Sequence, residues 1–503
     1  MDKKMRVAIP LAAMVIIWML PAPDGLTVHA MRFFGVFVAV ILGLILEPLP
    51  NSAVGLIGCV FAGILQLVPL AEKTMAAVAA AAKAGTAVVM PTISQANLGP
   101  SLSWSLSGFV DSTVWLIFVA YMFAMGYEKT GLGKRIALLL IKALGGRALG
   151  LGFAAACADG VLAPFMPSNT ARSAGSVYPV VKNIPPMYGS LPENDARKIG
   201  AYLMWVCIAT TCVTSSMFYT GVAPNPLALS LIRSAPGVTD PAAVNISWMT
   251  WFWCMLPAGA ILFLMVPLLT YVIYPPTQKL FPETPKWAAG ELEKLGPVTR
   301  KEIGMLVMTL IALSLWIFAE SYLNATQVAL VVLCLMLIAN IVTWDEVAAN
   351  KSAWNTLTWF ATLVAMASGL ARVGFLKWMS GIFAAHLDGS SPAVILFGLL
   401  ALFYFSHYFF ASLTAHTTAL MPVLLATGAA AGVDIRLLGM MLAGSLGIMG
   451  VLTPYGTGPS PVYYNTGYIE RKTFWIFGSL YGFIFFAVYA VFAFYWFPIA
   501  LKM

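Results

Sequence analysis

Two short polar sequences with the same pattern interrupt apolar stretches of this 503-residue chain. One reads S-N-T-A at residues 168–171 and the other S-L-T-A at residues 412–415, so they lie 244 residues apart. Hydroxyl and amide groups, together with the free backbone N–H groups at the start of a helix, bind anions. The sequence therefore predicts an anion site that draws on both motifs, with the binding residues Ser168, Asn169, Thr170, Ser412 and Thr414.

Two stretches rich in Gly and Pro follow the two motifs along the chain. They read T-G-V-A-P-N-P at residues 220–226 and G-T-G-P-S-P at residues 456–461. Each one breaks a long apolar run, as an unwound helix does at a binding site in the middle of a membrane. We predict that these stretches complete the site with Thr220, Gly221, Pro224, Asn225, Thr457, Gly458 and Pro459.

A side chain that can carry positive charge follows each motif threonine by two positions. It is Arg172 in the first motif and His416 in the second, again 244 residues apart. A buried cation is costly in a membrane and commonly marks a functional partner, so both are predicted to be fixed positive charges beside the site. The simpler alternatives are a capping or snorkelling role for Arg172 and an ordinary core histidine for His416. Asp159 could pair with Arg172, but we do not predict this pair.

The composition indicates a membrane protein built from helices. Sixty per cent of the residues are hydrophobic and only 10% are charged, whereas soluble domains carry roughly 25% charged residues. Residues 248–274 and 473–501 contain no Asp, Glu, Lys or Arg, and each stretch exceeds the roughly 20 residues that span hydrocarbon. We therefore expect an all-α protein that crosses the bilayer many times.

Several other classes of function are disfavoured. The net charge of +8 comes from Lys and Arg in short loops, which is typical of cytoplasmic loops rather than of a nucleic-acid surface. There are only four histidines and no C-x-x-C pair among the six cysteines, so neither a metal, nor a cofactor, nor an embedded enzyme is predicted. A channel is disfavoured too, because the candidate binding site is duplicated.

Charge at the two ends of the chain predicts its orientation. Lys3, Lys4 and Arg6 precede the first apolar run and predict a cytoplasmic N-terminus. Arg471 and Lys472 precede the last run, which predicts an external C-terminus and an odd number of spans. The N-terminal segment also resembles a secretory signal with a weak cleavage-like sequence, V-H-A, at residues 28–30. We favour an uncleaved first helix, because more spans follow it.

The chain divides into two related membrane halves. Residues 275–303 hold nine charges and several prolines, so they are predicted to be a cytoplasmic linker between residues 1–274 and 304–503. Trp115 and Trp359 show the same 244-residue offset as the polar motifs. Each motif lies in a short apolar stretch broken by proline, near 150–180 and 395–425, which fits a re-entrant hairpin. A proline-kinked ordinary helix is the alternative, and the duplication favours hairpins in two inverted repeats.

The run P-S-N-T-A-R-S-A-G at residues 167–175, together with S-L-T-A-H-T at residues 412–417, resembles the divalent anion:sodium symporter family, and most closely its exchanger branch. The W-D-E-V sequence at residues 344–347 is also similar to the family. This resemblance implies a homodimer of eleven-span protomers in the inner membrane, each moving a mobile domain past a fixed scaffold as an elevator. Its substrates would be small di- or tricarboxylates such as malate, succinate, 2-oxoglutarate, citrate or tartrate.

The chain also departs from the pattern of the sodium-coupled members, which resemble S-N-T in both repeats. Leu413 stands where the second asparagine is expected, and a leucine has no oxygen for a hard cation. The first Gly/Pro stretch lacks the family's G-T-P-P-N form as well. We therefore predict sodium-independent exchange in which Arg172 and His416 replace the co-transported cation, with a sodium- or proton-coupled symporter as the alternative.

Overall fold

The computed structural model describes residues 3–84, 90–387 and 389–502. These residues form helices joined by loops, and two isolated backbone bridges are the only strand-like pairing among them. Eight helices are long and apolar enough to cross a membrane, and counting three bent pairs as one span each raises the number to eleven. The prediction of an all-α membrane protein with about eleven spans is therefore confirmed.

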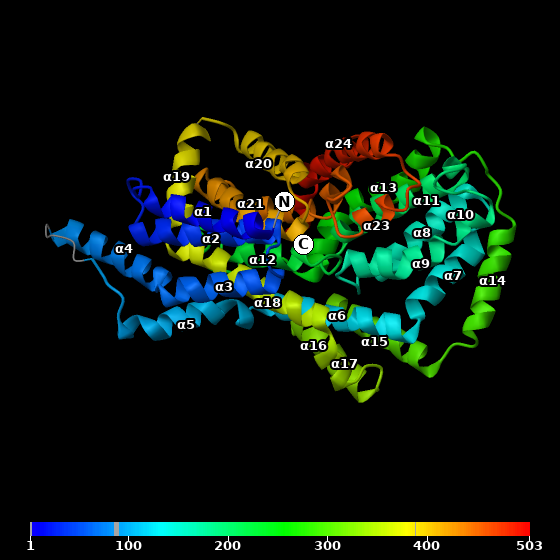
Figure 1. Cartoon of the computed structure of the whole chain (residues 1–503), viewed down its shortest axis with the longest axis horizontal. Coiled ribbons are helices and arrows are strands. Elements are labelled where there is room, and N and C mark those ends of the chain that lie inside the picture. The colour runs from blue at the N-terminus through cyan, green and yellow to red at the C-terminus, as the bar shows by residue number, and fades with distance from the viewer. Residues whose placement is uncertain (1–2, 85–89, 388, 503) are drawn as a thin grey trace.

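The N-terminal helices form one side of the molecule together with two helices from the second half. The helices of the first group are α1 (Lys3–Met19), α2 (Val28–Leu46), α3 (Asn51–Ile64), α4 (Leu67–Ala84) and α5 (Leu98–Leu106). Helix α6 (Ser112–Thr130) follows them and lies nearer the middle of the molecule. The two later helices are α18 (Lys351–Arg372) and α19 (Phe375–Leu387). Residues of α2, α3 and α4 share an apolar core with α18 and α19, and Figure 1 shows these helices gathered on one side.

The first polar motif lies at the turn of a helical hairpin. Helix α8 (Ala148–Leu162) leads to the turn at residues 163–169, and the chain returns through the π-helical segment η3 (Thr170–Val177) and α9 (Tyr178–Val181). Such π-helical segments are rare and occur frequently at functional sites. The broken span that follows consists of α11 (Gly200–Met217) and α12 (Pro224–Arg233).

The second half repeats this order of a hairpin followed by a broken helix. Its hairpin consists of α20 (Pro392–Ser406) and α21 (Leu413–Ala430). Ser412 caps α21, because its hydroxyl oxygen accepts from the backbone N–H of Ala415 at 3.3 Å. The broken helix then consists of α22 (Ile435–Gly444), η6 (Ile448–Leu452) and α23 (Ser460–Tyr464), and α24 (Arg471–Tyr495) follows it.

The charged linker is an ordered part of the fold. It contains α14 (Glu283–Leu295), which packs on the amphipathic helix α7 (Leu132–Leu144) at the end of the molecule away from α4 and α5 (Figure 1). Arg135 on α7 donates to Glu302 Oε1 at 2.5 Å and to the carbonyl oxygen of Gly296 at 3.2 Å. These bonds connect α7 to the linker and to the first turn of α15 (Arg300–Phe318).

Five further α-helices are present in the described structure. They are α10 (Ile184–Met187), α13 (Trp248–Ile273), α16 (Ala325–Ile338), α17 (Trp344–Ala349) and α25 (Phe497–Ala500). Glu346 on α17 pairs with Lys129 at the end of α6 at 2.6 Å. The hydrogen bond from Lys129 lowers the pKa of the Glu346 carboxyl group, so this surface contact stays ionised at neutral pH.

Candidate functional site

Both hairpin turns and both helix breaks meet around one cavity of about 210 Å³. Eight of the residues predicted from the sequence line it: Ser168, Asn169, Thr170, Ser412, Thr414, Pro224, Thr457 and Gly458. The motifs that are 244 residues apart in the chain therefore face a common space. The structure shows how one ligand could contact both halves at once.

The lining of this cavity suits an anion. The segments that begin at Thr170, Pro224 and Leu413 all start at its wall, and the N-terminal end of a helix carries partial positive charge. No Asp, Glu, Lys or Arg is among the described residues that line the cavity. Hydroxyl groups and an amide supply the polar contacts, and no negative side chain of the wall competes with the ligand.

The first hairpin turn is locked onto the second helix break. The side-chain nitrogen of Asn169 donates to Thr457 Oγ1 at 2.7 Å, and Asn169 is only 5% exposed. A Cβ atom at Gly458 would lie 1.9 Å from Thr170 Oγ1. Glycine at position 458 is therefore required by the close approach of the two segments.

Arg172 lies behind this wall in a cage of oxygen atoms. It is completely buried, and its Nε lies 3.1 Å from Asp159 Oδ2. Its Nη1 donates to the carbonyl oxygens of Met166 at 2.7 Å and Gly221 at 2.6 Å. Its Nη2 donates to three hydroxyl groups, those of Thr211, Thr214 and Ser215.

This arrangement corrects two expectations about Arg172. The pair with Asp159, which the sequence analysis did not predict, is present and neutralises the charge of the guanidinium group. Arg172 is also not among the residues that line the cavity. The prediction that Arg172 places an unpaired positive charge beside the ligand is therefore wrong. Packing of the two hairpin arms brings Asp159 of α8 against Arg172.

His416 is also buried behind the wall, but its surroundings are aromatic. Its ring stacks on Phe403 with centroids 4.5 Å apart, and the ring of Phe410 lies 4.7 Å away. Its Nε2 lies 3.0 Å from the hydroxyl oxygen of Ser406. A charged imidazole without a carboxylate partner is costly in such a place, so the geometry favours the simpler alternative of a core histidine.

Comparison with known proteins identifies the family. Residues 1–502 match the family described as the sodium:sulfate symporter transmembrane region. The chain belongs to this family. It is 43% identical over 489 residues to the citrate/succinate antiporter of Escherichia coli K12, which covers 96% of each chain. It is also 42% identical over 498 residues to the L-tartrate/succinate antiporter of the same strain, covering 99% of this chain and 98% of the relative. The predicted resemblance to the divalent anion:sodium symporters is thereby confirmed.

Two solved structures share the fold of this family member. They are the YdaH transporter of Alcanivorax borkumensis, with a TM-score of 0.57, and MtrF of Neisseria gonorrhoeae, with a TM-score of 0.55. Each is 14% identical in sequence. The first comparison covers 88% of this chain and 98% of the other, and the second covers 97% of both. At this identity the similarity shows a common fold alone.

The other predicted residues surround the site without lining it. The hydroxyl of Thr220 donates to the carbonyl oxygen of Pro164, and the carbonyl of Gly221 accepts from Arg172. The side-chain nitrogen of Asn225 donates to the carbonyl oxygens of Ser215 at 2.8 Å and Phe218 at 3.0 Å. Pro459 directly precedes α23. These residues shape the unwound segments, and the Gly/Pro signal in the sequence does not distinguish this role from ligand contact.

The wall opposite the hairpins was not predicted. It comes from α6 and α18, which contribute Tyr121, Thr356, Trp359 and Phe360. The 244-residue offset had marked Trp359 as a repeated position, but nothing in its local sequence indicated that it faces the cavity. Helices α6 and α18 are apolar on several faces, so their composition does not reveal which face meets the hairpins.

Proposed function

We propose that this chain is an inner-membrane antiporter that exchanges small di- and tricarboxylates, with succinate against citrate or tartrate as the foremost pairs. The named activities of its 42–43% identical relatives support this choice. Malate and 2-oxoglutarate remain candidates from the sequence. We place the N-terminus in the cytoplasm and the C-terminus outside, as the distribution of Lys and Arg predicts.

The observation that carries the proposal is the convergence of both hairpin turns on one cavity without charged lining residues. A dicarboxylate presents two separated groups of acceptor oxygens. The first turn, with Ser168 and Asn169, can donate to one carboxylate, and the second turn, with Ser412 and Thr414, can donate to the other. The duplicated motif then corresponds to the two ends of the substrate.

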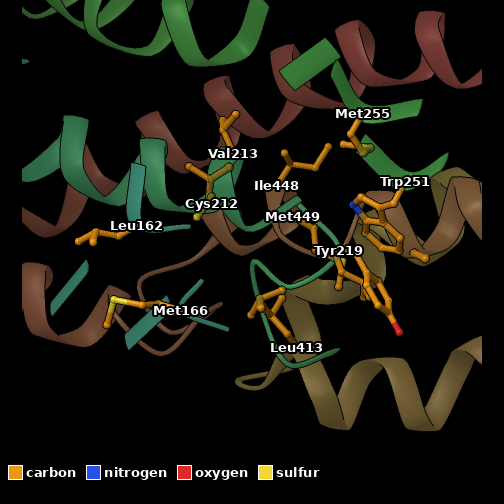
Figure 2. Packing of buried hydrophobic residues seen from close by; sticks show 14 of the residues in the cluster. Leu162, Met166, Cys212, Val213, Tyr219, Trp251, Met255, Leu413, Ile448 and Met449 are labelled. Carbon is orange, nitrogen blue, oxygen red and sulfur yellow. The ribbon is translucent and has the colours of Figure 1, made fainter. Parts of the chain in front are cut away.

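We propose further that exchange does not require sodium. The guanidinium group of Arg172 already occupies a site made of carboxylate, carbonyl and hydroxyl oxygens, which are the ligands that a hard cation prefers. In the second repeat, Leu413 stands at the position of Asn169 and belongs to the buried apolar cluster, members of which are drawn in Figure 2. Neither place offers an open set of oxygens to a free ion.

The coupling between the two substrates follows from the cost of an empty site. When the cavity closes without a ligand, its hydroxyl and N–H donors lose water and gain no acceptor, and each buried donor without a partner costs about 1–3 kcal/mol. A bound carboxylate supplies the acceptors. In the proposed elevator, the hairpins and broken helices of each protomer of a homodimer move past the wall of α6 and α18 mainly when they are loaded.

Counterflow in proteoliposomes tests the exchange. Vesicles are loaded with succinate or left empty, and the uptake of labelled citrate, tartrate, malate, 2-oxoglutarate and succinate is measured. We expect rapid uptake of one or more of these anions into loaded vesicles and little uptake into empty ones. Equal uptake into empty vesicles, driven by a sodium or proton gradient, would instead establish a symporter.

A further inference from the structure

A second cavity, of about 490 Å³, lies at the other end of α12. Helix α12 begins with Pro224 at the first cavity and ends with Arg233 at the second. Because ten helical residues rise about 15 Å, the two cavities are separate places. The second opens where α12 and α15 end and where α6, α13 and α16 begin, on the face that the sequence predicts to be external.

Unused hydrogen-bond donors face this second cavity. One guanidinium nitrogen of Arg233 donates to Asn245 Oδ1 at 2.5 Å. The other guanidinium nitrogens, the amide nitrogen of Asn245 and the hydroxyl of Tyr219 have no hydrogen-bond partner within the described chain. An arginine offers five N–H donors in a fork that matches a carboxylate, so most of this capacity remains available to a ligand.

Part of the wall beside these donors is formed by two largely buried tryptophans. The rings of Trp248 on α13 and Trp316 on α15 stack with centroids 5.7 Å apart and planes 9° apart. Both tryptophans line the cavity together with Leu229 and Leu323. The carbon chain of a small organic acid can pack on this surface while its carboxylate reaches Arg233.

Three carboxylates lie near the cavity, those of Asp240, Glu320 and Asp111. Asp240 is exposed, and its carboxylate accepts from the backbone N–H of Ala242 at 2.9 Å. Glu320 lines the cavity but is an exposed residue at its rim. Asp111 is not among the lining residues, and its carboxylate accepts from Thr113 and from Ser230, the latter at 2.8 Å. No ion pair joins Arg233 to any of these three acidic residues in the described structure. The positive charge of Arg233 is therefore directed at the cavity.

We propose that this second cavity binds an organic carboxylate anion, as a peripheral site distinct from the cavity between the hairpins. Arg233 and Asn245 hold the carboxylate, and Trp248 and Trp316 hold the carbon chain. Trp248 also connects the second cavity to the first helix break. Its indole nitrogen donates to the hydroxyl of Thr220 at 3.2 Å. The peripheral site does not depend on the exchange activity proposed above.

Equilibrium dialysis of the purified full-length protein with labelled citrate tests this site. We expect the wild-type protein to bind two citrates per chain, one of them weakly. Arg233→Gln should weaken the weaker site about tenfold, because it removes a charge-assisted bond, and Arg233→Lys should restore part of the affinity. Glu320→Gln should tighten the same site about threefold, because it removes a repelling charge.

Two further variants separate this site from the rest of the molecule. Arg471→Gln removes an exposed arginine at the start of α24, near the end of α13 that is opposite Trp248, and should leave both affinities unchanged. Asn169→Leu should weaken only the site between the hairpins. Size-exclusion chromatography and the melting temperature confirm that each variant is folded. A single citrate per chain that Asn169→Leu weakens and Arg233→Gln does not, or two unchanged sites in the folded Arg233→Gln variant, would overturn the proposal.

Discussion

The two repeats place the same backbone plan around chemically different groups. Arg172 lies against Asp159 and Met166, and the positions 244 residues later hold His416, Phe403 and Phe410. The contacts are repeated as well: Arg172 pairs with Asp159 and with the carbonyl of Met166, whereas the ring of His416 packs on Phe403 and Phe410. An ion pair in the first repeat thus corresponds to an aromatic stack in the second.

The hairpin turns show the same divergence. Asn169 donates to Thr457 across the cavity. The corresponding residue in the second repeat is Leu413, and when the P-x-P sequences of the two helix breaks are aligned, Val222 corresponds to Thr457. Leu413 and Val222 both line the cavity and belong to the apolar cluster. The first hairpin turn therefore makes a polar contact with the second helix break, whereas the corresponding residues of the second turn and the first break are apolar.

The largest difference between the repeats should appear in the folding free energy when the buried side chains of Arg172 and His416 are removed. Arg172→Leu leaves Asp159 charged and unpaired, and breaking a buried ion pair costs about 3–5 kcal/mol of folding free energy. His416→Leu loses one hydrogen bond and an aromatic contact, so it should cost about 1–2 kcal/mol. Thermal unfolding of the purified variants measures both effects.

A double variant provides the control for this experiment. Asp159→Asn combined with Arg172→Gln removes both charges, and it should recover part of the stability lost in Arg172→Leu. If Arg172→Leu is as stable as His416→Leu, the ion pair does not distinguish the repeats as we describe.

Disturbing the close approach of Gly458 to Thr170 at the first hairpin turn should give the next largest effect. Gly458→Ala places a methyl group against Thr170, so the two segments must separate and the affinity for succinate should fall at least about tenfold. Ala223→Gly, at the aligned position of the other helix break, should change the affinity less than about threefold. Isothermal titration with succinate measures both variants, and equal effects would show that the two breaks contribute alike.

Exchanging the residues at the tips of the two hairpins should give smaller effects, and the two effects should be unequal. Asn169→Leu removes the bond to Thr457, and a lost hydrogen bond of this kind is worth about 1 kcal/mol, or about fivefold in succinate affinity. Leu413→Asn should change the affinity less than about twofold, because Val222 offers no partner. The same titration measures both variants. A larger loss in Leu413→Asn than in Asn169→Leu would contradict the assignment of the polar contact to the first hairpin turn.

Much of the architecture could be predicted from the sequence, because long apolar runs, proline breaks and a repeated motif are local signals. The number of spans and the family were predicted in this way and are confirmed. The spacing of Ser168 and Ser412 also suggested that both motifs serve one site, and both line the same cavity.

Contacts between distant elements could not be predicted in the same way. Asp159 and Arg172 lie on opposite arms of a hairpin, and only the packing of the arms brings them within 3.1 Å. Tyr121 and Trp359 face the cavity because α6 and α18 lie across from the hairpins. Gly221 and Asn225 lie in a conspicuous Gly/Pro sequence, yet their polar groups bond to the protein itself. Local sequence reveals where a helix breaks and leaves open which group meets the ligand.

Sodium dependence of substrate binding tests the central claim most directly. The dissociation constant of succinate is measured with the purified protein in sodium chloride and in choline chloride of equal ionic strength. A sodium ion whose binding is coupled to that of the substrate raises the affinity for the substrate, because each ligand then changes the other's affinity by the same factor. Arg172 occupies the cage of oxygen atoms in the first repeat, and Leu413 stands at the second hairpin turn. We therefore expect the dissociation constants in sodium chloride and in choline chloride to agree within about twofold. An affinity about tenfold or more higher in sodium would contradict the account.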